Sequence, residues 1–205
     1  MLEPVGEEAI VSFDAPRPAI ALATHVRSTL LCSSLSALRA RKLYDAYLAA
    51  LAPEHRDTMT ALVPGLWVSI ELAVAHYSAC DALALTAPEI EGIGAEVAER
   101  IHHSFIGVIV KISREAGATP WALFGQSKKL RDLTWRGSDI AVTKLGPKEV
   151  RFEWAGIPCA KSRYYKTSFG GFLRAHVELV CRKAYAVSLA SYCSERALGY
   201  RVSWV

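Results

Sequence analysis

The sequence has few of the features that mark exported or membrane-spanning proteins. Its first eight residues contain three glutamates and no lysine or arginine, which argues against a secretory signal. The longest apolar stretch, residues 62–85, is interrupted by Glu71, His76 and Asp81. Polar side chains spaced in this way favour a buried helix over a bilayer span. We therefore expect a cytoplasmic protein without a membrane span.

Cysteine is scarce as well, and its pattern excludes two kinds of stabilisation. The five cysteines are odd in number and widely spaced, without any Cys-x-x-Cys pair. Neither a disulfide framework nor a zinc site is indicated. We expect buried free thiols at Cys32, Cys80, Cys159, Cys181 and Cys193.

Motifs that carry enzymatic chemistry are also missing. The chain has no Gly-x-Ser-x-Gly elbow and no His-Glu-x-x-His motif, and residues 125–129 lack the second glycine of a phosphate-binding loop. The adjacent His102 and His103 would point in different directions on a helix, so they cannot bind one metal ion together. His76, in an apolar stretch, needs a polar partner. We predict no catalytic residue, no metal site and no cofactor.

What is present is the composition of one globular domain. The 205 residues are 52% hydrophobic and 21% charged, which is enough for a substantial core without covalent staples. Residues 1–110 carry 7 Lys and Arg against 13 Asp and Glu, whereas residues 111–205 carry 17 against 7. Either a surface for an anionic partner or complementary halves of one fold or dimer would explain this asymmetry. Without a nucleic-acid-binding motif, we do not expect nucleic acid as a partner.

Hydrophobic periodicity in the first two thirds of the chain predicts mainly helices. Residues 1–25 are predicted as an extended arm with a short strand at 9–13, and residues 26–32 alternate like a strand. A capping-box pattern from Thr86 to Glu89 begins the most regular apolar stripe, which ends at Gly117. The other predicted helices cover residues 33–52, 64–83 and 121–133.

The last third predicts a hairpin, a helix and a second hairpin. Residues 139–145 and 150–155 alternate, with Phe152 and Trp154 on one face and Arg151 and Glu153 on the other. Residues 164–182 have helical periodicity, and residues 184–192 and 200–205 alternate again. The predicted fold class is α+β: an antiparallel sheet of hairpins covered by an N-terminal helical layer, in a single domain of residues 26–205.

Short motifs in this last third resemble a known family. They are LGP at 145–147, GIP at 156–158, FGGFL at 169–173, Cys193, Gly199 and YRVSW at 200–204. Their order resembles the Myxococcus-type paralogous family of uncharacterised proteins. More distantly, it is similar to the 4-vinyl reductase domain and to the superfamily of ligand-binding domains in nitric-oxide signalling and Golgi transport. The resemblance covers residues 28–205.

The resemblance implies a pocket between helices and sheet, which holds haem in one branch and fatty acyl chains or other apolar molecules in others. It also implies frequent dimerisation. The haem branch needs a proximal histidine on the helix before the hairpin, followed by a Tyr-x-Ser-x-Arg clamp. Residues 121–136 contain no histidine and residues 150–156 contain no such clamp, so we do not expect haem. Tyr200 stands where the vinyl-reductase pattern often has a cysteine.

We therefore predict a non-enzymatic sensory domain, forming a homodimer, with an apolar pocket for a small molecule or acyl chain. The alternative is a structural or adaptor protein that acts through protein contacts without a ligand. Adjacent Gly170 and Gly171 destabilise a helix, so they call for either close packing or room for a ligand. The predicted pocket residues are His102, Phe105, Trp121, Tyr165, Gly171 and Phe172.

Overall fold

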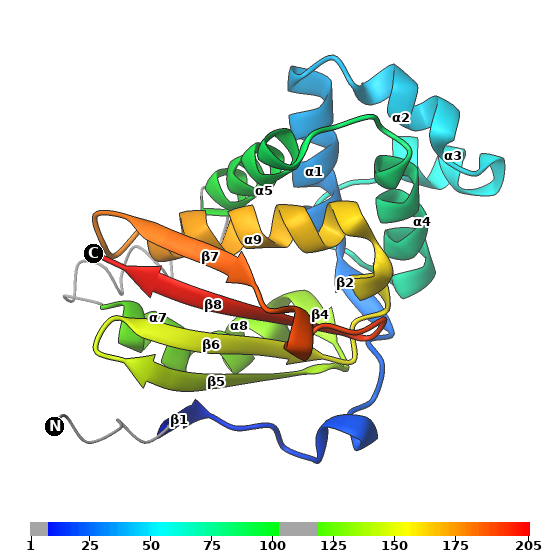
Figure 1. Cartoon of the computed structure of the whole chain (residues 1–205). Coiled ribbons are helices and arrows are strands. Elements are labelled where there is room, and N and C mark those ends of the chain that lie inside the picture. Colours follow the sequence, from blue (N-terminus) through cyan, green and yellow to red (C-terminus); the bar gives the residue numbers. More distant parts are fainter. Residues whose placement is uncertain (1–7, 103–118) are drawn as a thin grey trace, which may run out of the picture.

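A five-stranded antiparallel sheet forms one layer of the molecule, and helices cover one of its faces (Figure 1). The structure is a computed structural model that describes residues 8–102 and 119–205. The strand order is β1-β5-β6-β8-β7. This architecture confirms the α+β class. The strands are β1 (Glu8–Val11), β5 (Asp139–Gly146), β6 (Glu149–Ala155), β7 (Ala184–Ser188) and β8 (Ala197–Trp204).

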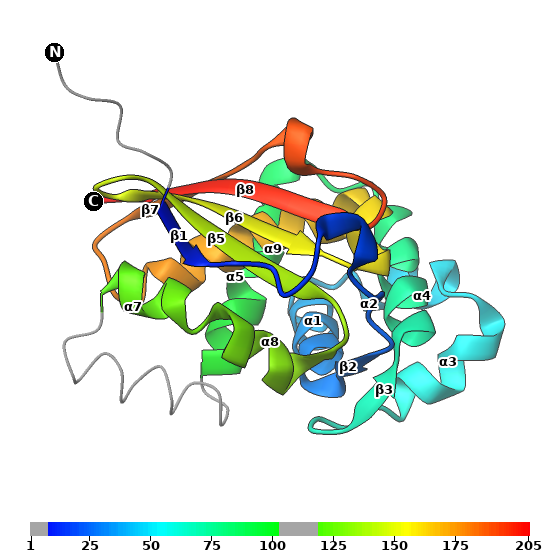
Figure 2. The same ribbon diagram turned by 90° about the horizontal axis from the view of Figure 1, so that it is seen from below.

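Alternation along β6 decides which side of the sheet becomes the core, as the sequence predicts. Phe152 and Trp154 are buried on the face toward the helices, whereas Arg151 and Glu153 form an ion pair on the other face. Two 3₁₀ turns, η1 (Arg17–Ala19) and η3 (Ala190–Tyr192), lie on that outer side (Figure 2). There, Arg17 donates a hydrogen bond to the Tyr192 carbonyl and pairs with Glu153. These contacts partly cover the outer face of the sheet.

The helical side is built around α5 and α9, which cross one another closely. Thr86 and Glu89 form the expected capping contact at the start of α5. The apolar stripe that follows is buried as far as Ile101, and the remainder of the predicted long helix lies outside the described residues. The helices are α1 (Ser28–Ala40), α2 (Tyr44–Ala50), α3 (Pro53–Thr60), α4 (Ile70–Asp81), α5 (Ala87–His102), α7 (Pro120–Gly125), α8 (Ser127–Thr134) and α9 (Arg163–Val177), with a 3₁₀ turn η2 (Pro158–Lys161).

Glycines allow α5 and α9 to approach to backbone contact. A Cβ added to Gly94 of α5 would overlap the carbonyl of Ser168, and one added to Gly171 of α9 would overlap the carbonyl of Glu91. Gly170 faces the sheet instead, where an added Cβ would make an ordinary contact 3.5 Å from the Tyr200 ring. The close packing at Gly171 is therefore against α5 and not against the sheet.

The N-terminal elements differ from their predicted bounds. The strand predicted over residues 26–32 ends at Arg27, because Ser28 begins α1. The Ser28 hydroxyl donates a hydrogen bond to Val63 O and accepts one from Leu66 N, both in a distant loop. The helix predicted over 33–52 is divided at Lys42, which has a left-handed φ of 59°. Local periodicity cannot register these long-range hydrogen bonds.

A second, three-stranded antiparallel sheet was not predicted. Its order is β3-β2-β4, and it joins three segments that are far apart in the sequence. Part of the helix predicted over residues 64–83 is instead the strand β3, and the helix α4 begins directly after this strand. Within the described residues, no helix is long and apolar enough to cross a membrane. The three strands are β2 (His25–Arg27), β3 (Trp67–Ser69) and β4 (Trp135–Arg136).

Candidate ligand-binding cavity

A cavity of about 130 Å³ lies between the sheet and the helices that cover it. Its walls come from α5 and α9, from the inner face of β5 and β6, and from α7 and α8, with further contributions from α1 and α4. Most of the wall is apolar, and much of it is aromatic. The aromatic side chains that carry the argument below are Trp135, Phe152, Trp154, Tyr165, Phe169 and Phe172.

One face of α9 supplies the aromatic centre of this wall. Residues 165, 169, 172 and 176 recur at helical spacing, so their side chains stack along the helix toward the sheet. The ring of Phe169 lies 5.8 Å from that of Phe172 at an interplanar angle of 10°, and 5.0 Å from that of Trp154. The ring of Phe172 in turn stacks on His176 at 5.8 Å. These contacts give the cavity flat walls.

The structure brings two of the six predicted pocket residues to this cavity. Tyr165 and Phe172 line it. Trp121 packs edge-on against Trp204 at 4.8 Å and is not among the lining residues. Gly171 faces α5, as described above. His102 ends α5, but its side chain and the whole of Phe105 lie outside what the structure describes.

Tyr164 is a polar lining residue for which no sequence pattern predicted a role. Its side chain is buried, and burial raises the pKa of its hydroxyl well above the usual range, so the hydroxyl keeps its proton. Ser34 and Cys80 are its polar neighbours, yet no atom of the described residues stands in hydrogen-bond geometry to it. A buried donor without a partner is uncommon in folded proteins.

Behind this end of the cavity lies a buried hydrogen-bonded chain centred on His76. The ring Nδ1 lies 3.0 Å from the hydroxyl of Tyr47, and Nε2 lies 2.9 Å from the hydroxyl of Ser34, which lines the cavity. Burial lowers the pKa of His76 to about 3, so the ring is neutral at ordinary pH. These bonds supply the partners that a histidine in an apolar stretch requires.

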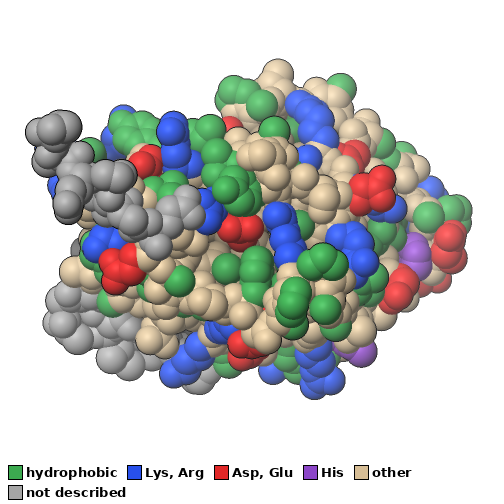
Figure 3. Space-filling model, turned by 60° about the horizontal axis from the view of Figure 1, so that its bottom comes forward, with side chains coloured by type: hydrophobic (Ala, Val, Ile, Leu, Met, Phe, Trp, Pro, Cys, Tyr) green, Lys and Arg blue, Asp and Glu red, His purple; other side chains and the backbone are tan. Residues whose placement is uncertain are grey.

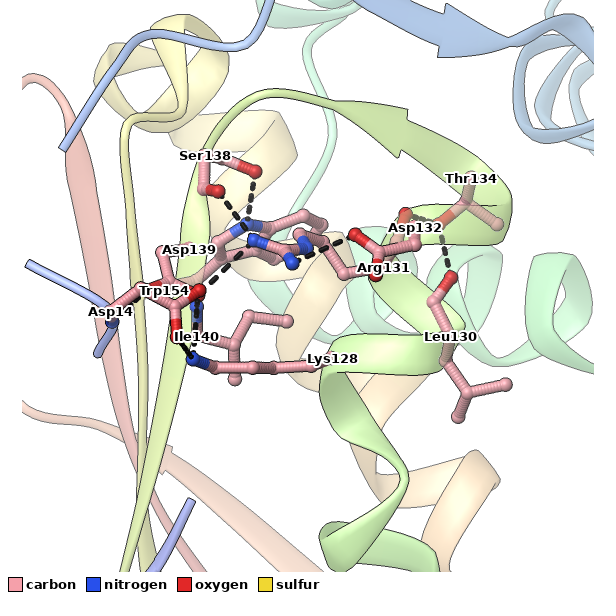
Figure 4. A network of polar contacts seen from close by, with 10 residues as sticks. All are labelled: Asp14, Lys128, Leu130, Arg131, Asp132, Thr134, Ser138, Asp139, Ile140 and Trp154. Atoms are coloured by element: carbon pink, nitrogen blue, oxygen red, sulfur yellow. Dashed lines mark hydrogen bonds and ion pairs between the residues drawn. The ribbon is translucent and has the colours of Figure 1, made fainter. Parts of the chain in front are cut away.

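At the other side of the cavity, Arg131 belongs to an ion-pair network that neutralises its charge (Figure 4). Its guanidinium donates to Ser138 O at 2.6 Å and to Asp139 Oδ1 at 3.1 Å. Asp139 also accepts hydrogen bonds from the backbone amides of Asp14 and Ile140, at 2.6 and 2.8 Å. The network therefore ties the N-terminal arm to β5 and is not an open anion site.

Charged side chains of both signs are mixed on the part of the surface that Figure 3 shows. There, lysine and arginine side chains are interspersed with acidic and hydrophobic ones. Among the described residues, no group of histidine, cysteine and acidic side chains is arranged to hold a metal ion. The five cysteines are free thiols, of which Cys80 and Cys159 are buried and the others half-buried.

The comparisons with known proteins place this cavity in a recognisable fold. No protein-family model and no curated protein matches the sequence. A solved Fe(II) unliganded H-NOX protein from K. algicida matches at TM-score 0.61, with 8% identity over 87% of this chain and 96% of that one. An oxygen-binding H-NOX domain related to soluble guanylate cyclases matches at TM-score 0.56, with 12% identity over 86% and 94%. This chain has the H-NOX fold.

The fold agrees with the distant resemblance to ligand-binding domains of nitric-oxide signalling. The nearer resemblance, to the Myxococcus-type family, gains no support from these comparisons. At such low identity the likeness shows the fold alone. A third solved structure matches at TM-score 0.56 with 10% identity; that protein modulates haem redox potential through protein-induced porphyrin distortion. Whether the present cavity suits haem is therefore decided by its own residues.

The described lining of the cavity does not fit haem. The helices directly before β5 are α7 and α8, and among the residues they present to the cavity are Ser127, Leu130 and Arg131, with no histidine. The stretch where a propionate clamp would follow, VRFEWAG at 150–156, contains no Tyr-x-Ser-x-Arg motif. A cavity of 130 Å³ is also close to the roughly 150 Å³ known to hold one benzene ring, far less than a porphyrin needs.

Proposed function

We propose that this chain is a non-enzymatic sensory domain that binds a small apolar molecule in the cavity between the sheet and α5, α8 and α9. The observation that carries the proposal is a cavity walled by stacked aromatic rings inside an otherwise well-packed core. Interiors normally fill such space, because lost contacts cost stability. A retained cavity at the centre of a sensor-type fold is best explained by an occupant.

The structure also links the cavity to elements that could transmit binding. The helix α9 forms one cavity wall and packs directly on α5, β7 and η2. A ligand that favours one position of α9 would therefore bias the position of each of these neighbours. We propose that this change is passed to a partner protein or to the second copy in the predicted homodimer.

Benzene provides the direct test, because its size matches the cavity. We expect saturating benzene to raise the thermal unfolding midpoint, since a ligand that binds only the folded state stabilises it. Val97→Phe on α5 and Leu130→Phe on α8 add a ring to the cavity wall and should abolish this increase. Val187→Phe, on the exposed side of β7, is the matched control and should preserve it.

Two results would decide against this function. One is the absence of any benzene effect on the wild-type protein, which would favour the adaptor alternative. The other is an increase that persists in both folded filling variants, because binding would then occur elsewhere. Each variant's midpoint without benzene shows whether it has folded.

A further inference from the structure

The cavity has a cluster of hydroxyl groups at one place in an otherwise largely aromatic wall. Where α1, α4 and the start of α9 meet, the lining includes the hydroxyl-bearing side chains of Ser34, Tyr77 and Tyr164. Phe152, Phe169 and Phe172 line the cavity with hydrocarbon, and its other polar lining side chains include those of Ser127, Arg131 and Thr134 on α8 and of Ser168 and His176 on α9. A ligand in this space therefore meets aromatic rings and, at α1 and α4, this hydroxyl cluster.

Of these hydroxyls, that of Tyr164 is available as a donor. Tyr164 is 1% exposed, and its oxygen has no hydrogen-bond partner among the described residues. The neighbouring Ser34 hydroxyl is already bonded to His76 Nε2 at 2.9 Å. A phenol donates one hydrogen and keeps its proton here, so the group it lacks is an acceptor.

The charge of the surroundings restricts that acceptor to a neutral molecule. Arg131 is the one Lys, Arg, Asp or Glu side chain among the described lining residues, and Asp139 pairs with it at 3.1 Å. His76, behind Ser34, is held neutral by burial. An ion at this end would lose its hydration without gaining a counter-charge, which is strongly unfavourable.

Size restricts the ligand further. A cavity of about 130 Å³ accommodates about one six-membered ring, whereas pockets for larger ligands enclose about 300–1,000 Å³. The parallel rings of Phe169 and Phe172, 10° apart in orientation, favour a flat body over a flexible chain. An extended acyl chain would require the walls to separate.

We propose that the ligand is a neutral, flat, single-ring molecule carrying one hydrogen-bond acceptor, which the hydroxyl of Tyr164 receives. This inference rests on the proposed function, because it assigns chemistry to the same cavity. It adds a specificity-determining residue, Tyr164, and a direction: the acceptor lies toward α1 and α4, and the ring lies among the aromatic side chains of α9 and β6.

Benzene and pyridine form a matched pair of probes for this proposal. They have the same shape, but only pyridine has a ring nitrogen that accepts a hydrogen bond. Their dissociation constants would be measured by NMR titration in mildly alkaline buffer, where pyridine is uncharged, for the wild type and for Tyr164→Phe. We expect the substitution to weaken pyridine binding relative to benzene binding by about two- to tenfold, the range for one neutral hydrogen bond.

A spectroscopic readout separates a hydrogen bond from a change of shape. The ¹⁵N resonance of bound pyridine should shift when Tyr164 loses its hydroxyl. Tyr185→Phe, on the exposed side of β7, is the control and should change neither the affinity ratio nor this resonance. Because the removed hydroxyl has no partner, Tyr164→Phe should fold with an unchanged or higher midpoint.

The outcomes distinguish this inference from the function on which it rests. If both probes bind and Tyr164→Phe leaves the affinity ratio unchanged, the acceptor assignment is overturned while the cavity remains a binding site. If neither probe binds the wild type, both proposals fail. Pyridine binding weakened by Tyr164→Phe, with benzene binding unchanged, supports the assignment.

Discussion

Gly171 of α9 lies so close to Glu91 of α5 that a Cβ on the glycine would overlap the glutamate's carbonyl oxygen. The preceding residue, Gly170, has no such neighbour and faces the Tyr200 ring at an ordinary contact distance. Adjacent glycines in one helix therefore have different structural roles. The first two substitutions proposed below use this difference, with each glycine as the other's control.

Gly171→Ala should destabilise the protein by about 1–3 kcal/mol, because the methyl group forces two helix backbones apart. Gly170→Ala should leave stability unchanged or raise it by up to about 1 kcal/mol, since alanine favours helix and space is available. Chemical denaturation of the two variants measures both effects. Equal destabilisation by both substitutions would contradict the packing described for α5 and α9.

Removing the carboxylate of Asp139 should be far more costly than removing an exposed partner of the same arginine. Asp139 is 6% exposed at its side chain and pairs with Arg131, whereas Asp132, which also pairs with Arg131, is 65% exposed. We expect Asp139→Ala to cost about 3–5 kcal/mol, because it removes the buried partner of a largely buried cation and leaves it only the exposed Asp132.

For Asp132→Ala, the expected cost is below about 1 kcal/mol. Urea unfolding of the two variants in the same buffer compares them directly. Similar costs would mean that the buried network contributes no more than a surface ion pair.

The buried His76 should make the protein sensitive to acid. Burial lowers the pKa of His76 from 6.5 to about 3. Between pH 6.5 and pH 3, the imidazole is therefore protonated in the unfolded chain but neutral in the folded protein. Stability is therefore complete above about pH 6.5 and is lost as the pH falls toward 3, by about 1.4 kcal/mol per pH unit at most.

The histidine's share is isolated by comparing the wild type with His76→Gln across this pH range. We expect the wild type to lose more unfolding free energy on acidification than the variant does. In NMR, the His76 ring resonances should not titrate between neutral pH and pH 5. A ring that becomes protonated in the folded protein near pH 6 would disprove the assignment.

Purified protein should not hold stoichiometric haem. The two helices directly before β5, α7 and α8, supply no histidine to the cavity, and the cavity holds about one ring. Addition of haemin should therefore produce no sharp Soret band that depends on a histidine. A band that disappears in His176→Ala, His102→Ala or His76→Ala would identify an axial ligand and reverse this conclusion.

The predictability of each element follows from the range of the interactions that form it. The β5–β6 hairpin and the first sixteen residues of the long helix were predicted well, because alternation and the Ile90–Ile93 stripe are local patterns. The start of α1 was missed because Ser28 bonds to residues 63–66, about 35 positions away. Periodicity carries no information on such contacts.

The candidate site divides in the same way. Tyr165 and Phe172 lie on the sheet-facing side of an amphipathic helix, so the sequence could place them near a pocket. The role of Tyr164 depends on Ser34, which is 130 residues earlier, and on the absence of a partner among the described residues. An unpaired hydroxyl is a property of the assembled core and has no counterpart in a sequence pattern.

The strand order also has a consequence for how this fold assembles. β6 joins β5 through a turn of two residues, whereas it pairs with β8 only after 41 intervening residues, and β1 pairs with β5 only after 127. Closing longer loops costs more chain entropy, so we expect the hairpin to form first, β8 next and β1 last. On unfolding, the Glu8–Val11 edge should detach before the centre of the sheet, exposing β5 to proteases and to strand exchange while the aromatic interior is still closed.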